Sequence, residues 1–138
     1  MRRAKGTLDD VRLLAEMNSR LIRDEGHRNP MTSPELEERM RRWLLTGEYE
    51  AVLFGGPPAE AYALFRRDGD SVHLRQFFVE RQFRRKGIGR AAFETLLREV
   101  WPAETRVTVD VLVSNQLGRA FWVVSSEWWK SAAPHHPA

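Results

Sequence analysis

Residues 84–89 read Arg84-Arg85-Lys86-Gly87-Ile88-Gly89, a basic run that ends in two glycines separated by one residue. The stretch before it, residues 73–79, is rich in aromatic and β-branched side chains, which predicts a strand. The stretch after it carries apolar residues at three- and four-residue intervals as far as Pro102, which predicts a helix of about three turns. A strand, a basic glycine loop and a helix therefore follow one another.

The glycine loop has the features of an anion-binding site. Gly87 and Gly89 lack Cβ atoms, so the backbone can approach a ligand closely, and the N–H groups of the helix's first turn point toward it. Mobile positive charge is expected from four neighbouring side chains: Arg84, Arg85, Lys86 and Arg90. The combination predicts binding of a diphosphate.

Three classes of ligand contain such a diphosphate. A nucleoside triphosphate loop needs Gly-Lys-Ser/Thr, whereas Gly89 is followed by Arg90-Ala91. A dinucleotide remains the alternative, because residues 87–92 satisfy G-x-G-x-x-A and Asp110 follows at about the distance of a ribose-binding acid. Coenzyme A fits best, since its additional 3′-phosphate suits several basic side chains placed just before the glycines.

A second motif lies downstream of the loop. Residues 106–113 predict another strand, and Asn115-Gln116-Leu117-Gly118-Arg119-Ala120-Phe121-Trp122 follows it. Together with Phe77-Phe78-Val79 and the spacing Arg84-x-x-Gly87-x-Gly89, this ordered pair resembles the GCN5-related N-acetyltransferases (GNAT), which use acetyl coenzyme A. The resemblance covers about residues 1–122.

The fold that this resemblance implies is a single α/β domain with a mixed, mostly antiparallel sheet flanked by helices. The segments before the loop agree: helices are expected from about Leu8 to near Gly26 and from Thr32–Pro34 to Gly47, followed by a meander over residues 49–54, 59–65 and 71–79. We place the domain at residues 1–130, with one or more C-terminal strands short or missing, and expect 131–138 to be a disordered tail.

The resemblance also implies a reaction, the attack of an amine on the thioester of acetyl-CoA. The backbone of residues 77–79 would pair with the pantetheine arm, Asn115 would steady it, and a strand N–H, that of Phe78 in our hypothesis, would polarise the carbonyl oxygen. The implied cofactor-binding set is Phe77, Phe78, Val79, Arg84, Arg85, Lys86, Gly87, Ile88, Gly89, Arg90, Asn115, Phe121 and Trp122.

The proton-transfer groups depart from the family pattern. Arg75 and Gln76 stand where many relatives carry a glutamate base, and Trp122 stands where a tyrosine acid is usual. An indole N–H is no practical acid near neutral pH, so we expect transfer without an essential tyrosine. The base is sought among four residues, of which the first two are our catalytic candidates: Glu25, His27, His73 and Glu80.

Composition narrows the class of protein. The chain has 138 residues, no cysteine and no apolar stretch long enough to span a bilayer, which predicts one globular domain without disulfides or thiolate metal sites. We expect no metal and no membrane partner. The absent cysteines and the lack of a signal-peptide core agree with a cytoplasmic location.

Two rival functions and one assembly hypothesis stay open. A basic nucleic-acid-binding module is disfavoured, because 22 Lys and Arg stand against 19 Asp and Glu, a net charge of only +3. A protein of the same fold that binds coenzyme A without catalysis is the stronger rival. A shortened C-terminus would leave the strand at 106–113 with an open edge, which suggests a homodimer.

Overall fold

The structure is a computed structural model that describes residues 1–24, 26, 31–103 and 105–109. Its strands are β1 (Arg3–Lys5), β2 (Glu50–Phe54), β3 (Ala61–Asp68), β4 (Ser71–Val79) and β5 (Arg106–Val109). Its helices are α1 (Val11–Asp24), α2 (Ser33–Thr46) and α3 (Ile88–Thr95), with short helical turns η1 (Leu8–Asp10) and η2 (Arg81–Phe83) and a π-helical segment η3 (Leu96–Val100).

The strands form one mixed sheet in the order β1-β2-β3-β4-β5. Neighbours from β1 to β4 run antiparallel, and β4 and β5 run parallel, with Ser71 opposite Arg106 and Leu74 opposite Val109. The expected α/β class, the meander and the change of direction at β4 are confirmed. β1, which lies beside β2, was not predicted, because a three-residue strand carries no readable alternation.

Local sequence explains where the second helix begins and ends. The side chain of Thr32 accepts a hydrogen bond from the N–H of Glu35, whose carboxylate accepts one from the N–H of Thr32, a reciprocal capping box. Pro34 stands in the first turn, where its missing N–H costs nothing. Gly47 ends the helix at φ 79°, a left-handed conformation that favours glycine. These boundaries match the prediction.

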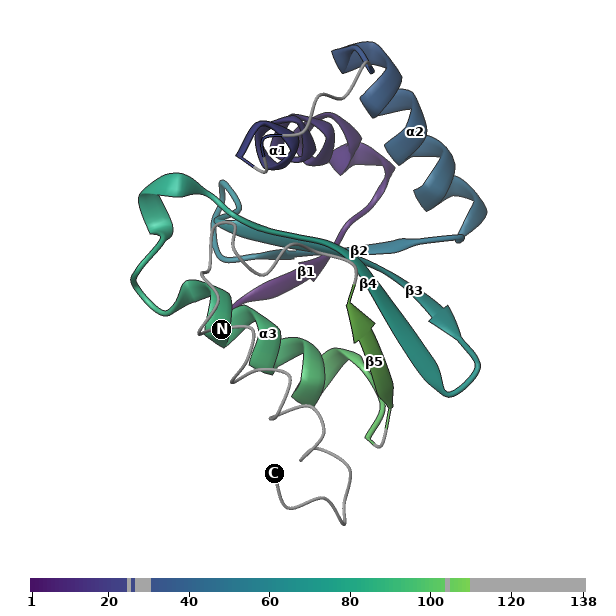
Figure 1. The fold of residues 1–138 in the computed structure, drawn as a ribbon, viewed down its shortest axis with the longest axis vertical. Helices are drawn as coiled ribbons and strands as arrows, with labels where there is room; N and C mark the ends of the chain where they lie inside the picture. Colours follow the sequence, from purple (N-terminus) through teal and green to yellow (C-terminus); the bar gives the residue numbers. More distant parts are fainter. Residues whose placement is uncertain (25, 27–30, 104, 110–138) are drawn as a thin grey trace.

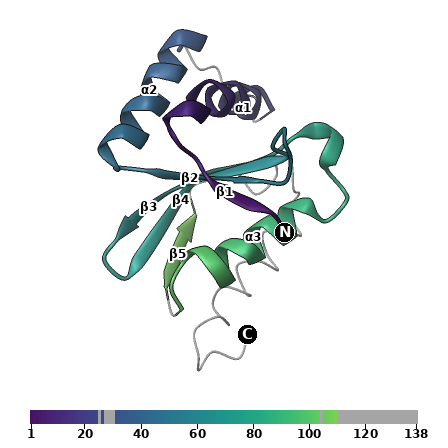
Figure 2. The same cartoon turned by 180° about the vertical axis from the view of Figure 1, so that it is seen from behind.

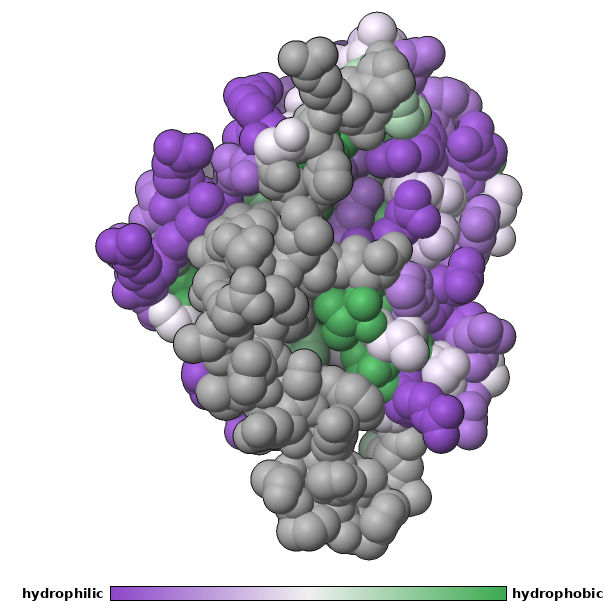
Figure 3. Space-filling view, in the orientation of Figure 1, coloured by the Kyte–Doolittle hydropathy of each residue, from purple (hydrophilic) through white to green (hydrophobic). Residues whose placement is uncertain are grey.

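The sheet separates two layers of helix, as Figures 1 and 2 show from opposite sides. α1 and α2 cover one face, and α3 covers the other. The core on the α3 side includes Phe77, Val79 and Phe93, and the core on the α1 and α2 side includes Leu14, Tyr62 and Phe78. Hydrophilic residues cover most of the described surface in Figure 3, with a small hydrophobic area near the centre of the view.

A β-bulge in β4 governs which side chains face which core. Gln76 pairs with Leu64 and Leu74 with Phe65, so Arg75 has no opposite residue on β3. Before the bulge, Leu74 faces α3; after it, Phe77 and Val79 do, and Phe78 faces α1 and α2. The extra residue thus shifts the alternation by one, as a single-residue slip must.

The structure does not describe residues 110–138, so three expectations about the C-terminal region are untested. β5 is seen over Arg106–Val109, so the rest of the strand expected at 106–113, the open edge of our dimer hypothesis and the 131–138 tail lie outside the described residues. Within the described ranges, no helix combines the length and apolar character needed to cross a bilayer.

Candidate anion-binding and acyl-transfer site

The loop between β4 and α3 carries a row of backbone donors beside the start of α3. Among the residues that the structure describes, none accepts a hydrogen bond from the N–H groups of residues 85–89, and the first bond into the helix runs from the N–H of Ala91 to the carbonyl of Gly87. Successive free N–H groups beside a helix N-terminus form a concave anion-binding surface. These donors lie where the glycine motif predicts an anion-binding loop, and their role in binding stays a prediction.

The shape of this loop depends on two left-handed residues. Gly87 caps α3 at φ 79°, and Arg85 has φ 64°, an uncommon conformation for a residue with a side chain. A Cβ added at Gly87 would meet no atom within 4 Å, so its φ angle, rather than a steric contact, is what requires glycine there. Arg85 and Lys86 are exposed beside the free N–H groups and can move toward a bound anion.

Arg84 behaves differently from its basic neighbours. Its Nε donates to the carbonyl of Val79 at 2.8 Å, and its Nη2 donates to Oδ2 of Asp24 at 2.5 Å. The side chains of Arg84 and Asp24 are each only 16% exposed. The expectation of a mobile charge therefore does not hold for this guanidinium, which instead ties the loop to the end of α1. That Arg84 binds the cofactor stays a prediction, and because its side chain is engaged, we expect its backbone to make the contact.

Asp24 is a charged anchor that the sequence analysis missed. Burial raises the pKa of this carboxyl. Hydrogen bonds and charges from Arg84 and then Arg81 lower the pKa by more, so it lies below the ordinary value. Asp24 ends a helix 60 residues before Arg84, and no local pattern links them. Only the tertiary contact reveals the pair.

The hydrogen-bond ladder determines which N–H groups of β4 point to β3 and which point to the opposite edge. Glu80 donates its N–H to the carbonyl of Glu60, and hydrogen-bonded pairs alternate along an antiparallel ladder, so the N–H of Phe78 points to Tyr62 on β3. The N–H groups of Phe77 and Val79 point to the opposite edge. Phe78 therefore does not supply the carbonyl-polarising donor of our hypothesis, and the ladder favours Val79 instead.

Within the described residues, β5 pairs with the first part of β4 on this same edge. Described pairing runs from Ser71–Arg106 to Leu74–Val109, which leaves residues 75–79 beyond it. The side chains of Phe77, Phe78 and Val79 are at most 1% exposed and fill the two cores. What this segment can offer a ligand is its backbone, which is the role expected from the sequence.

Two of the four candidate bases, Glu25 and His27, lie outside the described residues. The predicted cofactor-binding residues Asn115, Phe121 and Trp122 also lie outside them, so all of these roles stay predictions.

The remaining candidates have side-chain partners. Both carboxylate oxygens of Glu80 accept hydrogen bonds from Arg20, at 2.9 and 2.6 Å, and Nδ1 of His73 lies 2.8 Å from Oγ1 of Thr108. Glu80 is thus engaged in a bidentate ion pair, which leaves it less available as a base.

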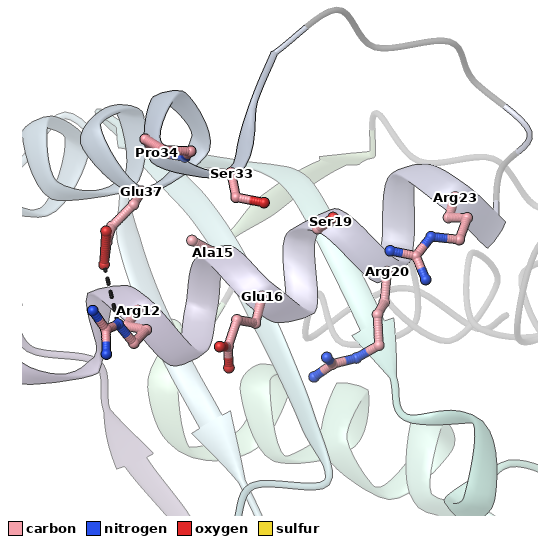
Figure 4. Close-up of a pocket in the computed structure, with 9 residues that line it drawn as sticks. All are labelled: Arg12, Ala15, Glu16, Ser19, Arg20, Arg23, Ser33, Pro34 and Glu37. Carbon is pink, nitrogen blue, oxygen red and sulfur yellow. Dashed lines mark ion pairs between the residues drawn. The ribbon is translucent and has the colours of Figure 1, made fainter.

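A pocket of about 540 Å³ opens between α1 and α2 (Figure 4). It is polar: Arg12 and Glu37 face each other across it at 3.7 Å, and Arg20 extends to Glu80 at the end of β4. Its lining residues are Arg12, Ala15, Glu16, Ser19, Arg20, Arg23, Ser33, Pro34 and Glu37. The pocket is therefore linked to the β4 edge through one arginine. No cluster with the ligand set of a metal site occurs among the described residues.

Taken together, the five-stranded mixed sheet that changes direction at β4 and the helices on its two faces define a mixed α/β fold. The model of the Acetyltransferase (GNAT) family matches residues 19–123, and the chain belongs to that family. Among curated proteins, none matches the chain significantly.

Solved structures agree on the fold. A predicted acetyltransferase with acetyl-CoA from Clostridium acetobutylicum is 16% identical, with a TM-score of 0.68 over 90% of this chain and 87% of that one. A ribosomal-protein-alanine N-acetyltransferase from Brucella melitensis is 14% identical, with a TM-score of 0.64 over 91% of both chains. At these identities the likeness shows the shared fold, as our sequence analysis expected.

Proposed function

We propose that this protein transfers an acetyl group from acetyl-CoA to a primary amine of a small molecule or peptide. The single observation that carries the proposal is the row of N–H groups at residues 85–89 without an acceptor among the described residues. Unpaired donors at a helix N-terminus are stabilised by a diphosphate, and family membership makes coenzyme A the expected carrier of that diphosphate.

The chain's own residues divide the task of binding. The backbone of residues 85–89 holds the diphosphate, while the exposed side chains of Arg85 and Lys86 add charge. The outward edge of β4 at Val79 receives the arm that carries the acetyl group. Because the side chains of this edge are buried, the contact is made by main-chain groups alone.

The proposed reaction forms a C–N bond and breaks a C–S bond. Acetyl-CoA supplies an activated thioester, and the neutral amine attacks its carbonyl carbon. The nitrogen of the tetrahedral intermediate then loses a proton to water, and coenzyme A leaves as a thiolate that takes up a proton from water. The N–H of Val79 is the proposed donor to the carbonyl oxygen, since it points away from β3 and is fixed before reaction. Holding both reactants together supplies several kcal/mol of the barrier.

A matched pair of glycine variants tests the binding step. Gly87 and Gly69 both have positive φ angles, 79° and 65°, and neither has an atom within 4 Å of an added Cβ. Each change to alanine should therefore cost a similar ~1 kcal/mol of stability. Only Gly87→Ala should weaken acetyl-CoA binding in calorimetry, by about tenfold, because only it disturbs the cradle; equal affinities for both variants would refute the assignment.

Turnover separates the proposed enzyme from its rival. Thiol release from acetyl-CoA should appear with at least one primary amine of a panel that contains amino acids, peptides, polyamines and aminoglycosides. Stoichiometric acetyl-CoA binding without transfer to any of them would instead identify a coenzyme A-binding protein without catalysis. That rival is favoured by the engagement of Glu80 with Arg20.

A further inference from the structure

Two arginines meet at one tryptophan on the α1 and α2 face of the sheet. The Cζ of Arg39, from α2, lies 4.6 Å from the ring centroid of Trp43, and the Cζ of Arg75, from the bulge in β4, lies 5.0 Å from it. Trp43 is 7% exposed, so its ring is a buried support for both guanidinium groups. We refer to Arg39 and Arg75 as the arginine pair.

Neither member of the arginine pair has a carboxylate partner among the described residues. Nη2 of Arg39 donates to Oδ1 of the buried Asn18 at 3.1 Å, and Nη1 of Arg75 reaches the hydroxyl of Tyr49 at 3.4 Å. Nε of Arg39 is buried with no hydrogen-bond partner. Since a guanidinium has several N–H donors, most of the donors of the pair have no protein acceptor among the described residues.

This arrangement is costly for the protein alone. Burial, followed by the charge of Arg75, lowers the pKa of Arg39, which shows that both desolvation and like-charge repulsion act on it. Arg39 and Arg75 are each half-buried, and arginines withdrawn from water are normally paired with acids. An anion placed between the two groups would relieve both penalties, and the planar fork of arginine matches a carboxylate with two parallel hydrogen bonds.

The arginine pair lies close to the proposed reaction centre. Arg75 precedes Val79 by four residues, which spans at most about 13 Å along an extended strand. The bulge releases Arg75 from the ladder on the face that also holds Phe78 and the hydrogen-bonded Gln76 and Tyr62. One molecule of modest length can therefore reach both the guanidinium groups and the outward edge of β4.

We propose that the arginine pair binds a carboxylate of the acceptor, so that the acceptor is an amine that also carries a carboxylate, an amino acid or a short peptide. The proposal rests on the proposed function and specifies its substrate class. Polyamines and aminoglycosides are disfavoured as acceptors, because two unpaired guanidinium groups repel a polycation. Binding of the carboxylate at the arginine pair would also determine how far from the pair the amine can lie.

The test compares acceptors that differ only in their charge. A series of ω-amino acids of increasing chain length is assayed against the corresponding carboxamides, with saturating acetyl-CoA and kcat/KM as the readout. The native protein should prefer the carboxylate at least tenfold at one chain length. Arg39→Met and Arg75→Met should each abolish that preference, whereas Arg41→Met, at an exposed arginine of α2, should keep it.

Two further measurements keep the test decisive if a methionine variant does not fold or if no acceptor is acetylated. Arg39→Lys and Arg75→Lys retain the charge but lose the fork, so they should fold and keep only part of the preference. Glutarate, which has no amine, should shift the side-chain Nε–H resonance of Arg39 in the native protein without any transfer.

The outcomes separate the two proposals. Equal rates for carboxylates and carboxamides, with acetyl-CoA turnover intact, would overturn this inference alone. A failure of acetyl-CoA to bind would instead refute the proposed function, and the glutarate titration would still decide the anion site. An unchanged Arg39 resonance would show that the pair is only a structural stack on Trp43.

Discussion

Breaking the ion pair between Asp24 and Arg84 should loosen the loop before α3, although Asp24 is not itself a proposed ligand contact. In the structure, Asp24 accepts hydrogen bonds from Arg84 at 2.5 Å and from Arg81 at 3.3 Å, and Arg84 also holds the carbonyl of Val79. Asp24→Asn keeps the size of the side chain and removes its charge. The loop then loses its charged connection to α1.

The expected magnitude follows from the burial of the pair. Exposed ion pairs contribute about 0–1 kcal/mol, whereas breaking a fully buried pair costs about 3–5 kcal/mol. With both side chains 16% exposed, Asp24→Asn should reduce the free energy of unfolding by about 2 kcal/mol. For a domain of this size the melting temperature should fall by about 8 °C. Acetyl-CoA affinity should fall several-fold, since the cradle is less ordered.

The acid dependence provides an independent signature. Although burial raises the pKa of Asp24, Arg84 and Arg81 lower it by more, so the folded pKa lies below the unfolded one. A lowered pKa gives stability that is present above the unfolded pKa and is lost as the pH falls through the folded one. The difference between the native protein and Asp24→Asn should therefore be full above about pH 5 and shrink below about pH 4.

Urea unfolding across this pH range measures both effects, and Glu99→Gln is the matched control. It breaks the pair between Arg3 and Glu99, which has a similar distance of 2.9 Å but side chains that are 41% and 49% exposed. The control should cost less than about 0.5 kcal/mol. If Asp24→Asn cost no more than the control, or if its effect were the same at pH 3 and pH 7, the pair between Asp24 and Arg84 would not be what holds the loop to α1.

Two further substitutions test side chains near the strand. Tyr62→Phe should cost about 1 kcal/mol, because Gln76 loses a donor to its Oε1, yet leave kcat within about threefold; a near-complete loss would make this tyrosine essential. Glu80→Gln should weaken the ion pair with Arg20 and lower the melting temperature, with kcat again within about threefold. A fall of about a hundredfold at unchanged acetyl-CoA affinity would identify Glu80 as the base.

Elements with strong local signals were predicted closely. The strand at Ser71–Val79 and the helix from Ser33 to Thr46 agree with expectation, because turn residues and a capping box mark their ends in the sequence. The helix at Ile88 also begins where expected, after Gly87. β3 extends to Asp68, beyond the predicted Phe65, since its last residues are polar and resemble a turn.

The sequence indicated the backbone features of the candidate site. It did not indicate the side-chain contacts between residues far apart in the chain. The glycine spacing indicated the free N–H groups of residues 85–89, but the anchoring of Arg84 by Asp24 depends on a contact 60 residues away. The direction of the Phe78 N–H depends on the phase of the ladder, which a bulge at Arg75 resets. A bulge has no reliable signature in one sequence, so the phase had to come from the structure.

The bulge in β4 connects the two proposals. By shifting the alternation, it sends Phe77 and Val79 into one core and Phe78 into the other, so the side chains of this segment are used in packing and its outward backbone remains for the cofactor. The residue that the bulge sets free is Arg75, which lies on Trp43 beside Arg39. One extra residue thus orients both the main-chain edge proposed for acetyl-CoA and the cation proposed for the acceptor, and realigning the strand should disturb both together.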